Sequence, residues 1–193
     1  MRSLSHRAIF SRNLIIALAT IYTIGHSTRE LPELISALQA HGIKTLIDIR
    51  SFPMSRRLPH FNRENLEKSL PEAGIAYVWL RELGGRRGKQ VPESPNKALR
   101  NTSFRNYADY MLTPEFQNGI AELLSIAKTG PVAIMCAERV YFRCHRMLVS
   151  DYLTAHGHEV LHIDNDKPAR PHKLMAEARL VNGQLLYKGD DLF

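Results

Sequence analysis

The chain has 193 residues, of which 44% are hydrophobic, 23% are charged and 8% are aromatic. This length suits one compact domain, and the composition excludes a largely disordered, collagen-like or disulfide-stapled protein. Lys and Arg outnumber Asp and Glu by 26 to 19, and the resulting formal net charge of +7 favours an anionic partner. Two cysteines, Cys136 and Cys144, are too few for a secreted disulfide framework, so we expect a cytoplasmic protein.

Residues 1–19 are interpreted as a flexible basic leader ahead of a single domain that covers residues 20–193. The segment 1–29 contains four arginines and no acidic residue. Its apolar run, residues 14–19, is shorter than the core of a usual signal peptide. No later segment approaches the length of a membrane span, so we expect no membrane partner.

Hydrophobic periodicity predicts strands and helices that alternate along the chain. In chain order these are a strand at 21–24, a helix that ends at Gly42, a strand at 45–49, a helix at about 63–73, a strand at 75–80, a helical stretch at 103–128, a strand at 132–136, a helix at 144–155, a strand at 160–163 and a hairpin of 178–181 with 184–187. We therefore expect an α/β fold, with a mostly parallel sheet of about five strands, helices on both faces and a C-terminal β-hairpin from about residue 174.

Local sequence patterns predict three of the boundaries. Ser27 with Glu30 fits a capping box at the start of the first helix. Thr113 precedes a proline inside the long helical stretch and predicts a break there, with Thr113 as the cap of a second helix. The dipeptide Asn182-Gly183 is a strong signal for a hairpin turn.

Residues 84–102 break the alternation. The segment contains glycines, prolines and several basic residues, and it fits neither a strand nor a helix. Loops of this length inside a compact domain are commonly functional. A glycine-rich backbone with Arg86 and Arg87 is able to wrap and neutralise a phosphate, so this loop is expected to bind an anion.

Polar residues follow several of the predicted strands, at the carboxyl edge where parallel sheets bind ligands. The densest cluster is 136–146, in which Cys136 ends a strand and Cys144 begins a helix. A thiol at a helix N-terminus beside cations loses its proton more easily. The candidate catalytic residues at this edge are Cys136, Glu138, Cys144, His26 and Asp48.

The same edge carries candidate anion-binding residues, namely Arg50, Arg86, Arg87, Arg143, His145 and Arg146. Structural alternatives exist for several of these candidates. Asp48 and Arg50 are close enough in sequence to pair with each other, and a cysteine such as Cys136, at the end of a buried strand, is often inert core filling. His26 follows a glycine at the entry to a helix, a place suited to binding an anion or to holding an imidazole neutral.

Established sequence signatures restrict the chemistry. A tyrosine-phosphatase-like loop places its arginine one residue closer to the cysteine than Arg143 is to Cys136. Phosphate-loop and dinucleotide-binding fingerprints are missing, and so is a Cys-x-x-Cys pair. Zinc bound by Cys136, Cys144, His145 and His26 is an alternative, although neighbouring Cys and His ligands on one ion are awkward, and no metal ligand is assigned.

Several separate motifs resemble those of a known family. They are Thr23-Ile24-Gly25-His26-Ser27, Asp48-Ile49-Arg50-Ser51-Phe52-Pro53, Leu83-Gly84-Gly85, Phe104-Arg105-Asn106-Tyr107-Ala108-Asp109-Tyr110-Met111, and Cys136-Ala137-Glu138 with Cys144-His145-Arg146. In this order they are similar to the domain-of-unknown-function family 488 (DUF488) over residues 20–163. The resemblance implies a small prokaryotic protein in which these polar positions are shared, and it implies no reaction.

These patterns favour an enzyme that acts on an anionic, nucleotide- or nucleic-acid-like substrate, as a thiol-dependent hydrolase or transferase. One alternative is a non-catalytic module that binds nucleic acid or phosphate, and another is a zinc-dependent enzyme. The expected partner is an anionic small molecule or a nucleic acid, and no cofactor or oligomeric state is assigned. The charge distribution favours a local anion site, because residues 1–29, 50–63 and 81–105 together carry +13 and the rest carries −6.

Overall fold

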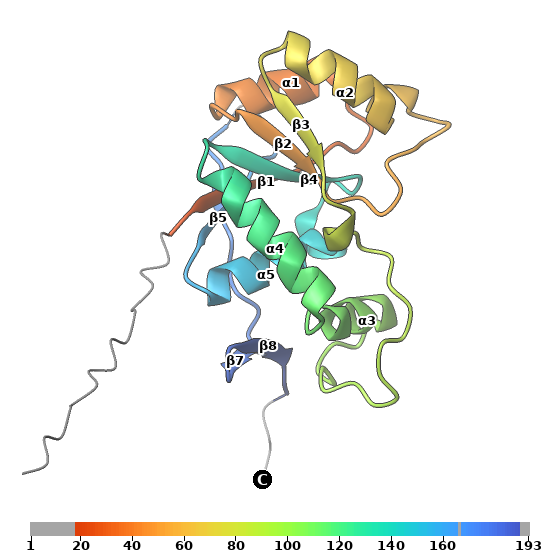
Figure 1. Cartoon of the computed structure of the whole chain (residues 1–193), viewed down its shortest axis with the longest axis vertical. Helices are drawn as coiled ribbons and strands as arrows, with labels where there is room; N and C mark the ends of the chain where they lie inside the picture. Colours follow the sequence, from red (N-terminus) through yellow and green to blue (C-terminus); the bar gives the residue numbers. More distant parts are fainter. Residues whose placement is uncertain (1–17, 166, 190–193) are drawn as a thin grey trace, which may run out of the picture.

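A six-stranded, mostly parallel sheet forms the centre of the computed structural model, which describes residues 18–165 and 167–189 (Figure 1). Its order is β3-β2-β4-β1-β5-β6, and only β6 runs antiparallel to its neighbour. The strands are β1 (Thr20–Gly25), β2 (Thr45–Asp48), β3 (Ala76–Trp79), β4 (Val132–Cys136), β5 (Glu159–His162) and β6 (Arg170–Pro171). The predicted parallel sheet is confirmed. Two-residue β6 was not predicted, because it is too short to show a period.

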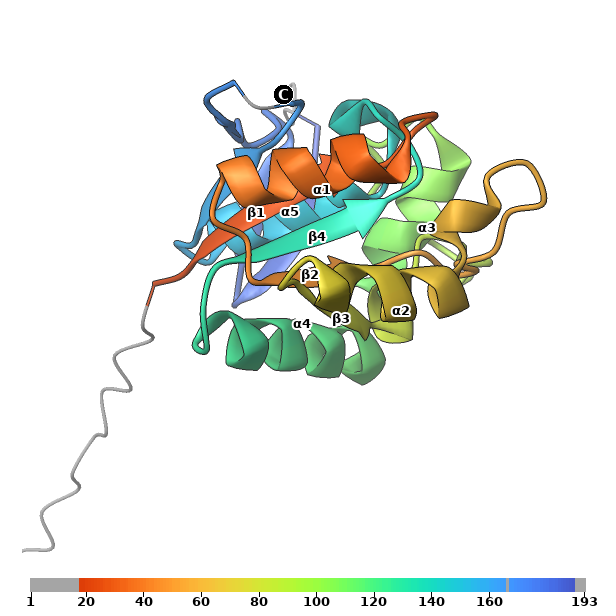
Figure 2. The same ribbon diagram turned by 90° about the horizontal axis from the view of Figure 1, so that it is seen from above.

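Helices cover both faces of this sheet, as the alternation predicted. They are α1 (Leu31–Ala40), α2 (Arg63–Glu72), α3 (Thr102–Tyr110), α4 (Pro114–Ala127) and α5 (Arg146–Ala155), with short 3-10 turns at Pro59–Phe61, Arg81–Leu83 and Tyr141–Arg143. In Figure 2, α1 lies in front of β1 and β4, and α5 lies behind them. Over the described part of the chain, no helix is long and apolar enough to cross a membrane. Of the predicted leader, residues 1–17 lie outside the described residues.

Alternate residues of the central strands supply two hydrophobic cores. Ile47 is fully buried in the core shared by α3, α4 and α5, whereas its neighbour Leu46 is fully buried in the core under α1 and α2. Successive side chains of a strand point to opposite faces, so a strand that is covered on both faces needs apolar residues at every position. This explains why residues 46, 47 and 49 are all apolar, and the buried Asp48 between them is the exception.

The helix boundaries differ from the predicted ones at two places. The capping box uses Glu30 and Glu33, because Ser27 lies earlier, in a turn with φ of 51°, and the N–H of Glu30 donates to the Glu33 carboxylate at 3.0 Å. The last helix begins at Arg146, two residues after the predicted start at Cys144. The break at Thr113 is confirmed, since its hydroxyl accepts the N–H of Phe116.

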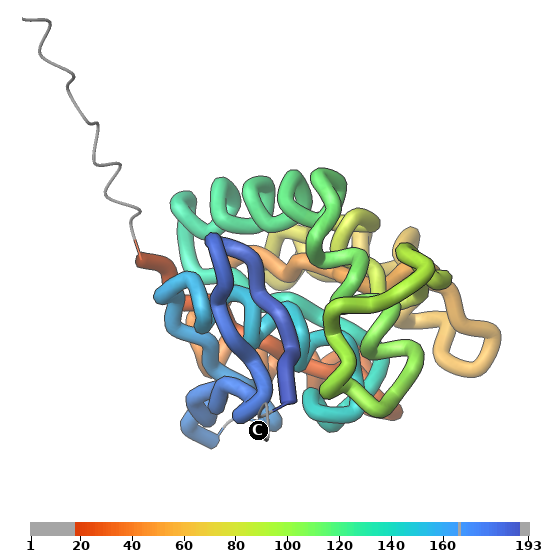
Figure 3. Tube along the Cα trace, turned by 90° about the horizontal axis from the view of Figure 1, so that it is seen from below, coloured from red at the N-terminus to blue at the C-terminus, as the bar shows by residue number. Residues whose placement is uncertain are grey.

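The predicted hairpin is confirmed as β7 (Ala178–Val181) and β8 (Gln184–Tyr187). Its turn residues Asn182 and Gly183 both have positive φ, as the twist of a two-residue hairpin loop requires. The hairpin packs beside the long loop at 84–101, which Figure 3 shows from below. The N–H of Tyr187 donates to the Asn96 side chain at 2.9 Å, and this bond ties the hairpin to the loop.

Candidate functional site

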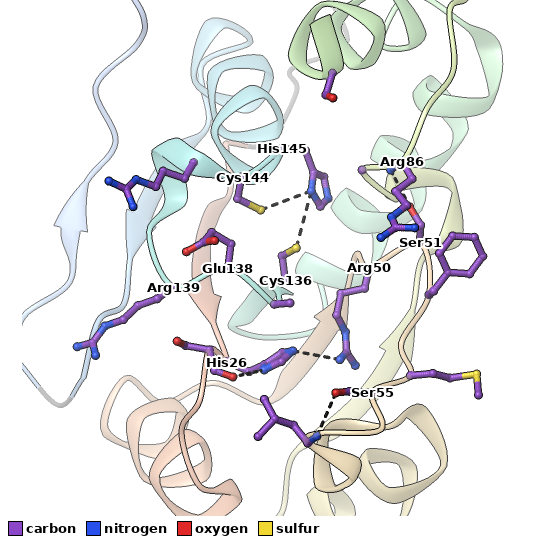
Figure 4. A pocket seen from close by; sticks show the side chains of 18 of the residues that line it. His26, Arg50, Ser51, Ser55, Arg86, Cys136, Glu138, Arg139, Cys144 and His145 are labelled. Carbon is purple, nitrogen blue, oxygen red and sulfur yellow. Dashed lines mark hydrogen bonds between the residues drawn. The ribbon is translucent and has the colours of Figure 1, made fainter. Parts of the chain in front are cut away.

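A cavity of about 940 Å³ lies beyond the carboxyl ends of β1, β2 and β4 (Figure 4). All of the strands that feed it are parallel, so their following loops leave at one edge of the sheet. Eight of the eleven residues selected from the sequence line this cavity, namely His26, Arg50, Arg86, Cys136, Glu138, Arg143, Cys144 and His145. The other three, Asp48, Arg87 and Arg146, lie outside its lining and are described below.

His145 is the centre of the site. Its Nε2 lies 3.0 Å from the carbonyl oxygen of Ile49. A carbonyl only accepts hydrogen bonds, so Nε2 carries the proton of the neutral ring and Nδ1 keeps a free lone pair. That Nδ1 lies 3.5 Å from the sulfur of Cys144 and 3.8 Å from the sulfur of Cys136. The geometry therefore suits His145 as a base for the thiols, whereas the sequence suggested that it binds an anion.

The two thiols have different acidities although they are neighbours. A hydrogen bond from Cys136 and the charge and N–H groups of Arg146 lower the pKa of Cys144 to about 7, against the opposing effect of burial. The same sulfur–sulfur hydrogen bond, together with burial, raises the pKa of Cys136 to about 12. Cys144 is thus the more acidic thiol of the pair, and Cys136 is its hydrogen-bond donor. The structure contains both as free cysteines.

Arg146 holds the loop between the two cysteines instead of lining the cavity. The side chain is 1% exposed, and its guanidinium donates to the carbonyl oxygens of Glu138 and Arg139, the latter at 3.1 Å. The backbone N–H of Arg146 donates to the Cys144 sulfur at 3.5 Å. This arginine therefore positions the loop and stabilises the thiolate, because it brings a buried positive charge and the first turn of α5 next to the sulfur.

A directed chain of buried hydrogen bonds anchors Arg146. Its Nη1 donates to the Thr23 hydroxyl at 3.2 Å, and that hydroxyl contacts Nδ1 of His162 at 2.8 Å. His162 then contacts His172 at 2.9 Å, and His172 contacts the Asp151 carboxylate at 2.8 Å. The guanidinium only donates and the Asp151 carboxylate only accepts. With both histidine rings neutral, each group in the chain can therefore accept one hydrogen bond from the Arg146 side and donate the next one towards Asp151.

Asp48 and Arg50 form a buried ion pair under the cavity. Asp48 is 0% exposed and Arg50 is 6% exposed, and Nε of Arg50 lies 2.9 Å from one carboxylate oxygen. The Tyr77 hydroxyl donates to the other carboxylate oxygen at 2.7 Å, so the Asp48 carboxylate is enclosed by donors. Asp48 was a candidate catalytic residue or a structural partner of Arg50. The geometry favours the structural role, in which Asp48 positions Arg50.

His26 supports the same arginine. Its Nδ1 lies 2.9 Å from the Ser27 carbonyl oxygen, and its Nε2 lies 3.2 Å from Nη1 of Arg50. Burial, followed by the charge of Arg50, lowers the pKa of His26 to about 4, so the ring is neutral and Nε2 accepts from the arginine. The ring also stacks on Phe61 at a centroid distance of 4.2 Å. His26 is therefore suited to hold Arg50 at the cavity wall.

The arginines at the cavity differ in how far their charge is neutralised. Arg50 pairs with Asp48, and Arg139 pairs with Asp164 at 3.2 Å. Within residues 18–165 and 167–189, Arg86 and Arg143 form no ion pair, and both are exposed at the cavity. Glu138 is the one acidic residue among the described residues that line the cavity.

Arg87 points elsewhere in the molecule. Its guanidinium lies 3.8 Å from the Tyr110 ring centroid and donates to the carbonyl oxygens of Arg81 and Glu82. Two neighbours in the long loop thus have separate positions, with Arg86 at the cavity and Arg87 bound to the 3-10 turn. A cation that is already engaged in this way is a poor candidate for direct anion binding.

Sequence reasoning placed the basic segment 50–63 at this edge, but it did not select Ser51, Phe52 or Met54 as residues of the site. The Ser51 hydroxyl accepts the N–H of Arg86 at 2.8 Å and thereby fixes the start of the long loop. Phe52 and Met54 line the cavity mouth and are 65% and 79% exposed. Nothing in a single sequence distinguishes exposed apolar residues from core residues, but their place directly after Arg50 was a usable signal.

Replacing Gly85 with Ala is expected to displace the His145 ring and to lower the free energy of unfolding by about 1–3 kcal/mol. A Cβ at Gly85 would lie 2.4 Å from Nδ1 of His145, which is far inside contact distance. Gly88→Ala is the matched control, because a Cβ there meets nothing within 4 Å, and we expect a change within about 0.5 kcal/mol. Urea denaturation measures both, and equal stabilities of the two variants would contradict the close approach.

Comparison with known proteins assigns the chain to a family. The family model described as "Domain of unknown function DUF488" matches residues 30–153, a range that contains Asp48, Arg50 and the segment 136–146. His26 lies before the matched range. No curated protein and no solved structure matches the chain. The chain therefore belongs to the DUF488 family, the one that its separate motifs resemble.

Proposed function

We propose that this protein is a thiol-dependent hydrolase or transferase that acts on an anionic substrate of the nucleotide or nucleic-acid type. The observation that carries the proposal is the convergence of two thiols on the unprotonated Nδ1 of His145, at distances of 3.5 and 3.8 Å, beside a cavity lined by arginines. A nucleophile, a base and a group that orients the base are the parts that covalent catalysis needs. Here they are Cys144, His145 and the Ile49 carbonyl.

Cys144 is the better nucleophile of the two cysteines. Its sulfur lies closer to Nδ1 than that of Cys136, and it accepts the N–H of Arg146 at the start of α5. These contacts favour a sulfur that carries negative charge. Cys136 is the more exposed thiol, and it supports Cys144 as a hydrogen-bond donor.

The cavity favours an anionic substrate. Arg86 and Arg143 are exposed at its rim without an acidic partner in the described part of the chain, and Nη1 of Arg50 reaches its wall beside His26. Guanidinium groups bind phosphate and carboxylate oxygens with two parallel hydrogen bonds. The Phe52 ring at the mouth is 65% exposed, and the Arg86 guanidinium lies 5.7 Å from its centroid. The exposed part of the ring offers an apolar surface for a base of a nucleotide-like substrate, next to a cation for its phosphate.

The proposed reaction has two steps. The thiol proton of Cys144 passes to Nδ1 of His145, the sulfur forms a bond to the electrophilic atom of the substrate, and the bond to the leaving group breaks as the leaving group takes that proton. Water, or an acceptor in a transferase, then gives a proton to Nδ1 and attacks the same atom. The bond to the Cys144 sulfur breaks, and the proton on Nδ1 returns to this sulfur, which restores the thiol and the neutral ring. Glu138 at the cavity is a second candidate for the proton transfer to the leaving group.

A turnover assay tests this function. The reduced, metal-free protein is incubated with nucleoside mono-, di- and triphosphates and with short oligonucleotides, and the products are separated. We expect turnover of at least one of these substrates, its loss in Cys144→Ser, and a decrease of about 10²–10⁴-fold in His145→Asn. Arg87→Gln is the control, since Arg87 lies away from the cavity.

Binding without turnover would contradict the enzymatic proposal. In that case, an affinity for oligonucleotides that decreases steeply with salt would favour the alternative of a non-catalytic binding module. Turnover that persists in Cys144→Ser and Cys136→Ser would contradict the role of the thiols and leave the anion site in place.

A further inference from the structure

We propose that Cys136, Cys144 and His145 form a three-ligand site for one Zn²⁺ ion, and that the bound ion switches off the thiol centre. One sulfur atom from each cysteine and one ring nitrogen of the histidine lie within 4.8 Å of one another. Binding of the ion is independent of any activity. Its regulatory consequence rests on the proposed function, because it concerns the same nucleophile and the same base.

The two sulfur-to-nitrogen distances fit a tetrahedral ion. With Zn–S bonds of about 2.3 Å and a Zn–N bond of about 2.0–2.1 Å, tetrahedral angles place a sulfur and a nitrogen ligand about 3.6 Å apart. The sulfur atoms of Cys144 and Cys136 lie 3.5 and 3.8 Å from Nδ1 of His145. An ion therefore requires only small side-chain shifts to enter between them.

The ring of His145 is already oriented as a zinc ligand. Histidines that bind metals usually donate their other ring N–H to a carboxylate or a backbone carbonyl, which fixes the tautomer and the ring plane. Nε2 of His145 donates to the Ile49 carbonyl oxygen at 3.0 Å, so the lone pair of Nδ1 faces the two sulfur atoms. The orienting contact that such a site needs is thus present.

The backbone conformation allows the neighbouring residues Cys144 and His145 to bind the same ion. Adjacent side chains of a regular strand point to opposite faces and do not bind one ion. Cys144 has an extended backbone, with φ and ψ of −130° and 152°, whereas His145 is helical, with −57° and −16°. This change at the start of α5 turns both side chains to the same side, as Figure 4 shows.

The donor chemistry selects zinc and leaves one coordination position open. Thiolate and imidazole ligands favour Zn²⁺ over Mg²⁺ or Ca²⁺, which prefer oxygen ligands. Two thiolates neutralise the charge of the ion. All three ligands line the cavity, so the fourth position faces the space where the substrate is proposed to bind. Three protein ligands and an open position are the pattern of accessible zinc sites.

A bound ion removes both parts of the proposed thiol chemistry. Coordination uses the lone pair of Nδ1, which the base needs, and the electron pair of the Cys144 sulfur, which the nucleophile needs. Binding also displaces any proton that remains on the two thiols, so the affinity increases with pH. The zinc-loaded protein is therefore expected to be inert towards alkylating reagents, and the metal-free protein reactive.

Cobalt substitution tests the site directly. The full chain is reduced, freed of metal with a chelator and titrated with Co²⁺. We expect thiolate-to-cobalt charge-transfer bands and intense tetrahedral d–d bands that saturate at one ion per chain. Zn²⁺ is expected to abolish these bands by displacement. Absence of the bands, or saturation of an octahedral spectrum only, would overturn the site without any need for a variant.

Ligand variants and a protection assay complete the test. Loss of a residue that only hydrogen-bonds to a zinc ligand typically lowers metal affinity about 10–100-fold. Cys136→Ser, Cys144→Ser and His145→Asn each remove a ligand itself, so each is expected to lower the affinity more than about 100-fold. His41→Gln, at the C-terminal end of α1, is the matched control and should bind like wild type. When wild-type protein is titrated with Zn²⁺, the rate of its alkylation by iodoacetamide should fall and reach its minimum at one equivalent of the ion.

The outcomes separate the two proposals. Tetrahedral binding with thiols that are unreactive even in the metal-free protein supports the zinc site and contradicts the thiol enzyme. Reactive thiols without tetrahedral Co²⁺ binding overturn the zinc site and leave the proposed function intact. Tetrahedral binding that does not slow alkylation overturns the regulatory role.

Discussion

Asp48→Asn is expected to lower the free energy of unfolding by about 3–5 kcal/mol, because it leaves the buried charge of Arg50 without its partner. The Asp48 carboxylate is fully buried and receives donors from Arg50 and Tyr77. An amide in its place carries no charge and offers only one acceptor oxygen. Urea denaturation at neutral pH, followed by a signal such as circular dichroism, measures the change.

Two variants give this prediction its controls. Tyr77→Phe removes one hydrogen bond to the same carboxylate and keeps the ion pair, so we expect a loss of only about 0.5–1.5 kcal/mol. The double variant Asp48→Leu with Arg50→Met removes both charges, and part of the stability lost in Asp48→Asn should return. A loss below about 1 kcal/mol in Asp48→Asn would contradict a buried, energetically important pair.

The alkylation of Cys144 in the reduced, metal-free protein is expected to be half-maximal near pH 7, since that is where its thiolate forms. The pKa is lowered, so the thiolate is present above that pH and is lost as the pH falls through it. The rate should therefore rise with pH and reach a plateau below the ordinary range of cysteine, about 8.5. Iodoacetamide labelling with detection by mass spectrometry assigns the rate to each cysteine.

A matched pair of variants at Cys136 tests the cause of this acidity. The hydrogen bond from Cys136 is the main contribution that lowers the pKa of Cys144. Cys136→Ser keeps a hydroxyl donor, so the midpoint should stay low, whereas Cys136→Ala removes the donor and should move the midpoint upward. Identical midpoints in the two variants would show that the hydrogen bond is not the cause, and a midpoint near 8.5 in wild type would contradict the thiolate itself.

Much of the fold follows from local sequence patterns. The apolar runs at 45–49 and 132–136 predicted buried parallel strands, because a strand covered on both faces has few positions for polar residues. Asn182 and Gly183 predicted the hairpin through their tolerance of positive φ. The capping box was placed three residues too early, because two acidic residues after Ser27 compete for the same role and a local pattern does not rank them.

The sequence predicted which residues gather at the candidate site, but it did not predict the role of each residue there. Parallel strands bring their carboxyl ends together, which is why eight selected residues from separate segments line one cavity. Asp48 and Arg50 could be recognised as a potential pair, since they are two residues apart. Arg86 and Arg87 could not be distinguished, because the path of the loop decides which of the two faces the cavity.

The sequence by itself determined the α/β fold, the C-terminal hairpin, the family and the edge at which polar residues gather, because these depend on periodicity, turn residues and motif order. Tertiary structure decided the chemistry. The proton on His145 is placed by the carbonyl of Ile49, which is 96 residues away in the chain. One of the contacts that hold Arg146 outside the cavity lining is made to Thr23, which is 123 residues away. Such contacts depend on which elements pack side by side, and the local helix and strand propensities of the sequence do not specify this packing.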